Sequence, residues 1–204
     1  MKKIAIAFFT LSLLTIPNYG LAIDPLPAQS KCSLMETNSP GIRGLRLGMS
    51  LEQLLAAFPG SSKRREMKDA IERAKTAGSG EVVQLAFDPA TDAGGDRFAG
   101  IDYVSAGIYK GRVADFYVIY VGPTWRSIDE WVTKLSEIFN LPNPQEWMAG
   151  SNENPNRILK CGGIEIEAAV QGGGASIRVR NTESMGAQEQ TRGEEERRRR
   201  AFKP

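Results

Sequence analysis

Two amphipathic helices, each followed by segments with strand patterning, constrain this chain more than any other feature of its sequence. Ser50 and Gln53 predict a capping box at the start of one helix, and Ser127 and Glu130 predict one at the start of the other. Apolar residues recur at helical spacing behind both caps, so each helix must bury one face. We therefore expect an α+β fold, with helices packed on one face of an antiparallel sheet.

The segment between these helices predicts one further helix and three strands. A narrower apolar stripe predicts a helix over Lys63 to Ala77. Alternation predicts a strand over Glu81 to Asp88, and β-branched and aromatic residues predict strands over Ile101 to Tyr109 and Val113 to Val121. The Lys110-Gly111 pair between the last two strands indicates a hairpin. We place Val113 to Val121 centrally in the sheet because it is almost continuously apolar.

The second half again places three strands after a serine-capped helix. Arg157 to Cys161, Ile164 to Val170 and Ala175 to Arg180 predict a three-stranded meander with glycine-rich turns. We expect a single domain over residues 23–184, built from two tandem helix–meander halves at 41–121 and 122–181.

Two stretches of the first half carry no helical stripe. Gly41 to Leu47 alternates apolar and polar residues and predicts a short edge strand, whereas Pro89 to Gly100 predicts a loop. Asp88, Asp92 and Asp96 recur every fourth residue around that loop, and calcium prefers several oxygen ligands on flexible backbone. Their spacing is not that of an EF-hand, so ordinary loop residues are the favoured interpretation over a weak calcium site.

The first 22 residues have the pattern of a signal peptide. Met1-Lys2-Lys3 is positively charged, Ile4 to Ile16 is uncharged and mostly apolar, and Gly20-Leu21-Ala22 places small residues where a signal peptidase cleaves. The apolar run is too short to span a bilayer comfortably. We expect an exported protein, periplasmic or extracellular, that is soluble after cleavage and is not an integral membrane protein.

The chain has two cysteines and no histidine. Such a pair normally oxidises outside the cytoplasm, so we expect a disulfide between Cys32 and Cys161. Lys31, directly before Cys32, argues against a lipidated cysteine. Without histidine, Ser-His-Asp and Cys-His mechanisms and the usual zinc sites are excluded, and no catalytic residue or cofactor is predicted. A pair of carboxylates could still act on a glycoside, and a serine–lysine pair also remains open.

Charge is concentrated near the end of the chain. Without Lys2, Lys3 and the tail from Met185, 18 basic residues stand against 20 acidic ones, so nucleic-acid binding has no electrostatic basis. We expect residues 185–204 to form a disordered tail or a solvated helix. The alternative is that its arginines contact an anionic envelope surface, and these are Arg197, Arg198, Arg199 and Arg200.

Aromatic side chains supply the other candidate interaction residues. Trp125 and Trp147 lie in proline-containing loops, and Tyr103, Tyr117 and Tyr120 lie on predicted strands. Aromatic residues anchor many protein interfaces, but they also fill cores, and both interpretations stay open.

The stretch Leu47-Gly48-Met49-Ser50-Leu51-Glu52-Gln53-Leu54-Leu55, with Phe58-Pro59-Gly60 after it, resembles the opening of the SmpA/OmlA (BamE-like) envelope lipoproteins. That resemblance implies a role in outer-membrane protein assembly. A duplicated module of the same kind builds the β-lactamase inhibitory proteins, to which the two halves are similar. The whole chain also resembles secreted bacterial proteins with a Gly-Leu-Arg-Leu-Gly-Met opening, and that likeness implies no activity.

Together these observations favour an exported, non-catalytic envelope protein that binds or helps to assemble another protein. Two alternatives stay open, a carboxylate-dependent hydrolase of cell-wall glycans and a small-ligand or lipid-binding domain.

Overall fold

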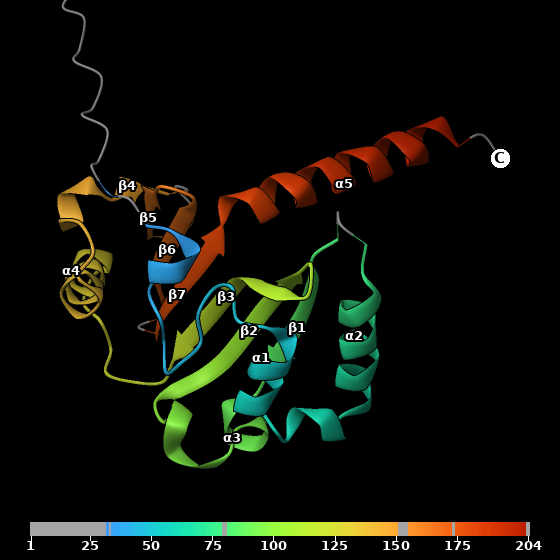
Figure 1. The fold of residues 1–204 in the computed structure, drawn as a ribbon. Coiled ribbons are helices and arrows are strands. Elements are labelled where there is room, and N and C mark those ends of the chain that lie inside the picture. The colour runs from blue at the N-terminus through green and yellow to red at the C-terminus, as the bar shows by residue number, and fades with distance from the viewer. Residues whose placement is uncertain (1–31, 33, 79–80, 151–154, 173, 203–204) are drawn as a thin grey trace, which may run out of the picture.

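The computed structural model describes residues 32, 34–78, 81–150, 155–172 and 174–202, so the expected signal peptide (1–22) lies outside the described residues. The fold is α+β, as expected, with one seven-stranded antiparallel sheet and helices packed on one of its faces (Figure 1). In the described ranges no helix combines the length and apolar character needed to cross a membrane.

The strands form two meanders that meet in the middle of the sheet. The first comprises β1 (Val83–Phe87), β2 (Ile101–Tyr109) and β3 (Arg112–Tyr120). The second comprises β4 (Met148–Ala149), β5 (Asn156–Cys161), β6 (Ile164–Gln171) and β7 (Gly174–Asn181). The order across the sheet is β1-β2-β3-β7-β6-β5-β4. The two halves therefore join where β3 pairs with β7, and the expected hairpin and meander are confirmed.

The helices begin where the capping residues predict. Ser50 Oγ accepts the Gln53 backbone N–H at 3.2 Å and starts α1 (Leu51–Ala57). Ser127 Oγ accepts the Glu130 N–H at 3.2 Å and starts α4 (Ile128–Phe139). The predicted capping box is only half formed there, because Glu130 Oε2 accepts the N–H of Arg126 rather than that of Ser127. Between α1 and α4 lies α2 (Arg65–Thr76). Helices α1 and α2 precede the first meander and α4 precedes the second, so both halves place strands after a serine-capped helix.

All three helices bury their apolar faces on the same side of the sheet. Helix α2 packs on β1, α1 on β3, and α4 on β5 and β6. Phe58 stacks on Phe87 at 4.3 Å and on Phe98 at 4.6 Å between ring centroids, which fixes the end of α1 over the first meander. One continuous core fills the space between helices and sheet.

The predicted disulfide is present. Cys32 and Cys161 are bonded across a sequence separation of 129, with 5.1 Å between their Cα atoms. The Leu34 backbone N–H lies 3.2 Å from Cys161 Sγ, so the segment after Cys32 runs beside the end of β5. The bridge thus fastens the start of the described chain to the second meander.

Two local expectations were wrong. Residues Gly41 to Leu47 form a tight reversal rather than a strand, because Ile42 and Leu45 hydrogen-bond each other and not the sheet. The loop from Pro89 to Gly100 contains α3 (Pro89–Asp92) and a short 3₁₀ helix (Gly95–Phe98). Proline at the first helical position favours that turn, since its fixed φ suits a helix and its missing N–H needs no partner there.

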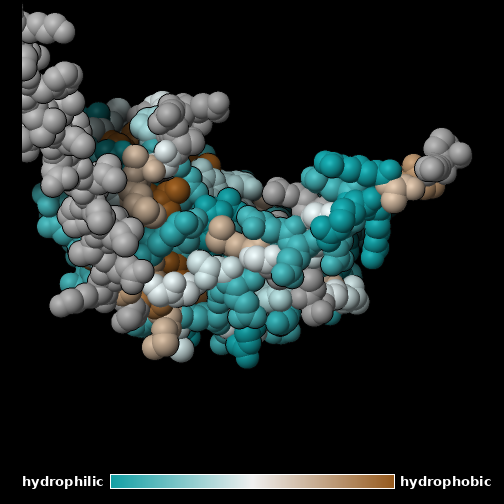
Figure 2. Space-filling model, turned by 90° about the horizontal axis from the view of Figure 1, so that it is seen from above, coloured by the Kyte–Doolittle hydropathy of each residue, from teal (hydrophilic) through white to brown (hydrophobic). Residues whose placement is uncertain are grey.

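The C-terminal tail is helical in its described part. Helix α5 (Thr182–Ala201) starts directly after β7, where Asn181 Oδ1 accepts the Glu183 N–H at 2.8 Å. Its first turn is tied to the β2–β3 hairpin by an ion pair between Lys110 and Glu183 at 3.6 Å. The rest of α5 extends away from the sheet and is covered by hydrophilic side chains (Figures 1 and 2).

The remaining short helices are 3₁₀ turns at Glu36–Asn38, Ser61–Lys63 and Pro144–Glu146. They connect the elements above and add no layer to the fold. Strand β4 was not foreseen, because two residues are too few to show alternation.

Candidate functional site

The first candidate surface is the face of the sheet opposite the helices, here called the open face. Strand register arranges its side chains in rows that cross the sheet. One row is mainly charged and consists of Gln84, Gly107, Asp115, Arg180, Glu165 and Lys160. The next consists of Ala86, Ser105, Tyr117, Arg178, Glu167 and Ile158. The third is mainly uncharged and consists of Tyr103, Ile119, Ser176, Ala169 and Asn156.

An ion pair spans the seam between the two halves on this face. Arg178 Nε on β7 lies 2.9 Å from Asp115 Oδ2 on β3, and Arg178 Nη2 also donates to that carboxylate. Burial by itself lowers the pKa of Arg178, but its hydrogen bonds and charge interaction with Asp115 outweigh that effect and the pKa is raised. The guanidinium is therefore firmly held in its charged form.

A second cluster of charges lies on β5, β6 and β7 of the open face. Arg180 Nη2 donates to Glu167 Oε2 at 2.8 Å, and Arg180 Nε lies 3.0 Å from Glu165 Oε1, at ion-pair distance but not aligned for a hydrogen bond. Lys160 Nζ lies 3.7 Å from Glu165, and Asn156 donates to Glu167 at 2.8 Å. Three carboxylates and three cations thus alternate across the face.

Aromatic side chains border these charges. The rings of Tyr103 and Tyr117 meet edge to face with 6.5 Å between centroids, and both are partly exposed. A shallow pocket with a volume of about 270 Å³ lies between Tyr117 and Arg178. Ser105 and Ser176 also line this pocket.

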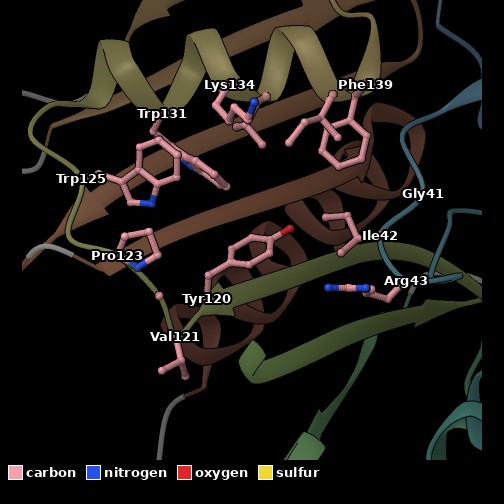
Figure 3. A pocket seen from close by; sticks show the side chains of 13 residues that line it. Gly41, Ile42, Arg43, Tyr120, Val121, Pro123, Trp125, Trp131, Lys134 and Phe139 are labelled. Atoms are coloured by element: carbon pink, nitrogen blue, oxygen red, sulfur yellow. The ribbon is translucent and has the colours of Figure 1, made fainter. Parts of the chain in front are cut away.

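The second candidate surface lies on the helical side, between the two halves, and is here called the aromatic pocket. It has a volume of about 470 Å³. Its walls come from the turn before α1, the end of β3, the loop after β3, and α4 (Figure 3). The lining residues are Gly41, Ile42, Arg43, Tyr120, Val121, Gly122, Pro123, Trp125, Trp131, Lys134, Leu135, Ile138 and Phe139.

Three aromatic rings form one side of this pocket. Trp131 packs against Trp125 at 4.8 Å and meets Tyr120 edge to face at 5.3 Å between ring centroids. Trp131 Nε1 donates to the Ser176 carbonyl at 2.9 Å, which anchors the central ring to β7. The middle ring of the three is thus held both by α4, to which Trp131 belongs, and by the sheet.

The hydroxyl of Tyr120 points into the aromatic pocket toward Ile42 and Arg43 (Figure 3). Burial raises the pKa of Tyr120 to about 12, while the charge of nearby Arg43 lowers it in part. Tyr120 is therefore a neutral hydroxyl donor at any physiological pH.

The residues singled out from sequence fall in three different places. Trp125 lines the aromatic pocket, whereas Trp147 is 5% exposed and packs into the core. The arginines named as the alternative contact with an anionic surface are exposed near the far end of α5, and they are Arg197, Arg198, Arg199 and Arg200. The structure brings neither tryptophan together with these arginines.

The weak calcium candidates have structural partners instead. Asp88 Oδ1 accepts the Ala90 N–H at 2.9 Å and caps α3. Asp92 is buried, pairs with Arg64 at 2.6 Å and accepts the Asp88 N–H. Asp96 is exposed. Within the described residues, no group of three histidine, cysteine, aspartate or glutamate side chains is arranged to hold a metal ion.

Sequence reasoning missed Arg43, Asp115 and Arg178 as site residues. The alternation in β6 and β7 does signal a polar face, but the pairing of β3 with β7 joins residues 63 positions apart. Compared with protein-family models, with curated proteins and with solved structures, the chain gives no match.

Proposed function

We propose that this chain is an exported, non-catalytic binding protein that holds a partner protein on its open face. One observation carries the proposal. The neighbouring strands β2, β3, β7, β6 and β5 present a continuous surface of paired charges and partly exposed tyrosines. Helices α1, α2 and α4 all lie on the other side of the sheet. Tyrosine and arginine are the residue types that most often anchor protein interfaces.

The paired charges support recognition of a specific partner. Asp115, Glu165 and Glu167 balance Lys160, Arg178 and Arg180, so the open face carries a fixed pattern of charges with no net charge. Charges held in place by their neighbours lose little freedom when a partner covers them. Fixed charges also select partners, because a wrong partner places like charges together.

The same pairs argue for binding over hydrolysis of cell-wall glycans. A glycosidase needs one carboxyl group that stays protonated and a second that faces the sugar. Asp115 and Glu165 are almost fully buried and are already engaged by arginines, so neither presents a free carboxyl group to a sugar. The open face therefore fits a docking surface better than a catalytic one.

Export is part of the proposal. It rests on the signal-peptide pattern of residues 1–22 and is supported by the Cys32–Cys161 disulfide, since such bonds persist outside the reducing cytoplasm. The partner is accordingly sought among envelope or secreted proteins.

The test is a quantitative pull-down from envelope extract with the disulfide-bonded protein as bait, followed by reconstitution with the purified partner. We expect a stoichiometric complex that the double variant Tyr103→Ala/Tyr117→Ala weakens by at least tenfold, because losing one anchor costs about 2 kcal/mol at a hot spot. The matched control is Phe202→Ala, which removes an exposed ring beyond the end of α5.

Two outcomes would contradict the proposal. Equal weakening by Phe202→Ala would place the contact outside the open face. Turnover of a cell-wall glycan that is abolished by Glu167→Gln would make the carboxylates of this face catalytic.

A further inference from the structure

The aromatic pocket is built like a site for an apolar ligand and lies on the side of the sheet that the proposed partner does not use. Its volume of about 470 Å³ falls within the range of small-molecule sites. Ile42, Trp131 and Leu135 are buried at its walls. Aliphatic and aromatic carbon therefore surrounds most of the space.

The rim of the pocket is also apolar although it faces solvent. Val121 is 60% exposed on the β3 side, and Ile138 is 58% exposed on α4. Both line the same pocket, with Trp125 and Phe139 partly exposed beside them. Contiguous exposed apolar surface is uncommon on a protein that binds nothing. The rim can therefore contact the part of a long ligand that extends out of the pocket.

The charges around the pocket have one sign. Arg43 and Lys134 are the only ionisable side chains besides Tyr120 among the described residues that line it. Lys134 pairs with Glu137 at 3.2 Å, whereas Arg43 hydrogen-bonds only a backbone carbonyl, that of Ala99 at 3.4 Å, and pairs with no described carboxylate. One positive charge is therefore left uncompensated, and the Tyr120 hydroxyl points toward it.

We propose that the aromatic pocket binds a fatty-acid anion, with the acyl chain against Trp125, Trp131 and Ile138 and the carboxylate at Arg43 and Tyr120. Arginine binds carboxylates with strong charge-assisted hydrogen bonds, and the tyrosine supplies a neutral donor beside it. A single negative charge matches the one uncompensated cation among the described residues that line the pocket. A phosphate monoester, which carries nearly two negative charges, matches it less well.

The backbone at Arg43 provides a variant that separates binding from folding. Arg43 has a φ of 52° and stands directly before Gly44 in the tight turn between Ile42 and Leu45. Asparagine adopts this left-handed conformation more readily than arginine does. Arg43→Asn is therefore expected to leave thermal stability unchanged or to raise it, so that any loss of ligand affinity reflects the missing guanidinium.

The experiment titrates the disulfide-bonded protein with dodecanoate below its micellar concentration, using calorimetry and tryptophan fluorescence. Dodecanol and dodecyl phosphate are titrated in parallel. We expect saturable one-to-one binding of dodecanoate, weaker binding of both other compounds, and a loss of at least tenfold in dodecanoate affinity for Arg43→Asn. Ile138→Asp, at an exposed rim position, should also weaken dodecanoate binding without unfolding the protein.

The matched control is Arg46→Asn, because Arg46 is an exposed arginine three residues further on that does not line this pocket. It should bind dodecanoate as the parent does. The proposal is overturned if dodecanoate does not bind, if Arg43→Asn and Arg46→Asn behave alike, or if dodecyl phosphate binds more tightly. It is also overturned if light scattering shows a dimer that Ile138→Asp dissociates, since a second copy would then occupy the pocket.

Discussion

Tyr120 is a residue whose burial has a measurable effect on stability. Its pKa is raised from the usual 10 to about 12 because the folded state disfavours the charged phenolate. The folded protein therefore holds this proton more tightly than the unfolded chain does. The stability that Tyr120 contributes is complete below pH 10 and is lost as the pH rises from 10 to about 12.

We predict that Tyr120→Phe removes this loss. Unfolding by urea, measured at several pH values between 10 and 12, should show a shallower decline for the variant than for the parent. Ultraviolet titration of the folded parent should show one tyrosine that ionises near pH 12, and that step should disappear in the variant. An unchanged titration curve would mean that Tyr120 is hydrated in solution.

At the scale of elements, the pairing of β3 with β7 is the contact that unites the two halves. The Asp115–Arg178 ion pair crosses that seam, with Asp115 almost fully buried and Arg178 about one-third exposed. Removing the arginine would leave a carboxylate without its partner in a poorly solvated position.

We predict that Arg178→Met lowers the free energy of unfolding by about 2 kcal/mol. Lys75→Met is the control, because it breaks an exposed pair with Glu72 on α2 and should cost less than about 0.5 kcal/mol. Adding Asp115→Asn to Arg178→Met should recover part of the loss. If Arg178→Met and Lys75→Met lowered the free energy of unfolding equally, the burial of the Asp115–Arg178 pair would add nothing to its strength.

The elements with strong local patterns could be predicted from sequence, and those set by tertiary contacts could not. The serine caps at Ser50 and Ser127 and the Lys110-Gly111 hairpin are local, so their helices and strands were predicted within a few residues. The reversal at Arg43 was missed because seven residues of alternating apolar and polar character fit two structures equally well. One is a short strand, and the other is a tight turn whose end residues Ile42 and Leu45 are buried.

The candidate sites were less predictable than the fold. Trp125 was identified as an interaction residue from its loop position, but the same criterion also selected Trp147, which is in the core. Nothing in the sequence places Arg43 beside Tyr120 or Asp115 beside Arg178, because both contacts depend on how the two halves meet. Contacts between residues that lie 63 or more positions apart produce no periodic pattern in the sequence.

At the scale of the whole molecule, the Cys32–Cys161 bond closes a loop that includes most of the sheet. Closing a loop of this length corresponds to about 5 kcal/mol in the chain-entropy model, and removing native disulfides typically costs 2 to 5 kcal/mol. Small domains are stable by only about 5 to 15 kcal/mol in total.

We predict that Cys32→Ala/Cys161→Ala lowers the melting temperature by about 4 to 20 °C, given about 2 to 5 kcal/mol for the bond and about 2 to 4 °C per kcal/mol for a domain of this size. Reduced parent protein should melt close to the double variant, and the double variant should not respond to reductant. A melting temperature that is the same with and without the bond would show that the core alone determines stability.

The pairing of β3 with β7 also has a consequence for biogenesis. Synthesis from the N-terminus delivers the first meander early, while β7 follows about sixty residues later. Until then the edge of β3 is an unpaired, largely apolar strand, which is a template for aggregation. Such a chain gains from a companion that shields this edge until β7 is made, and its folding yield should depend on how quickly the last meander arrives.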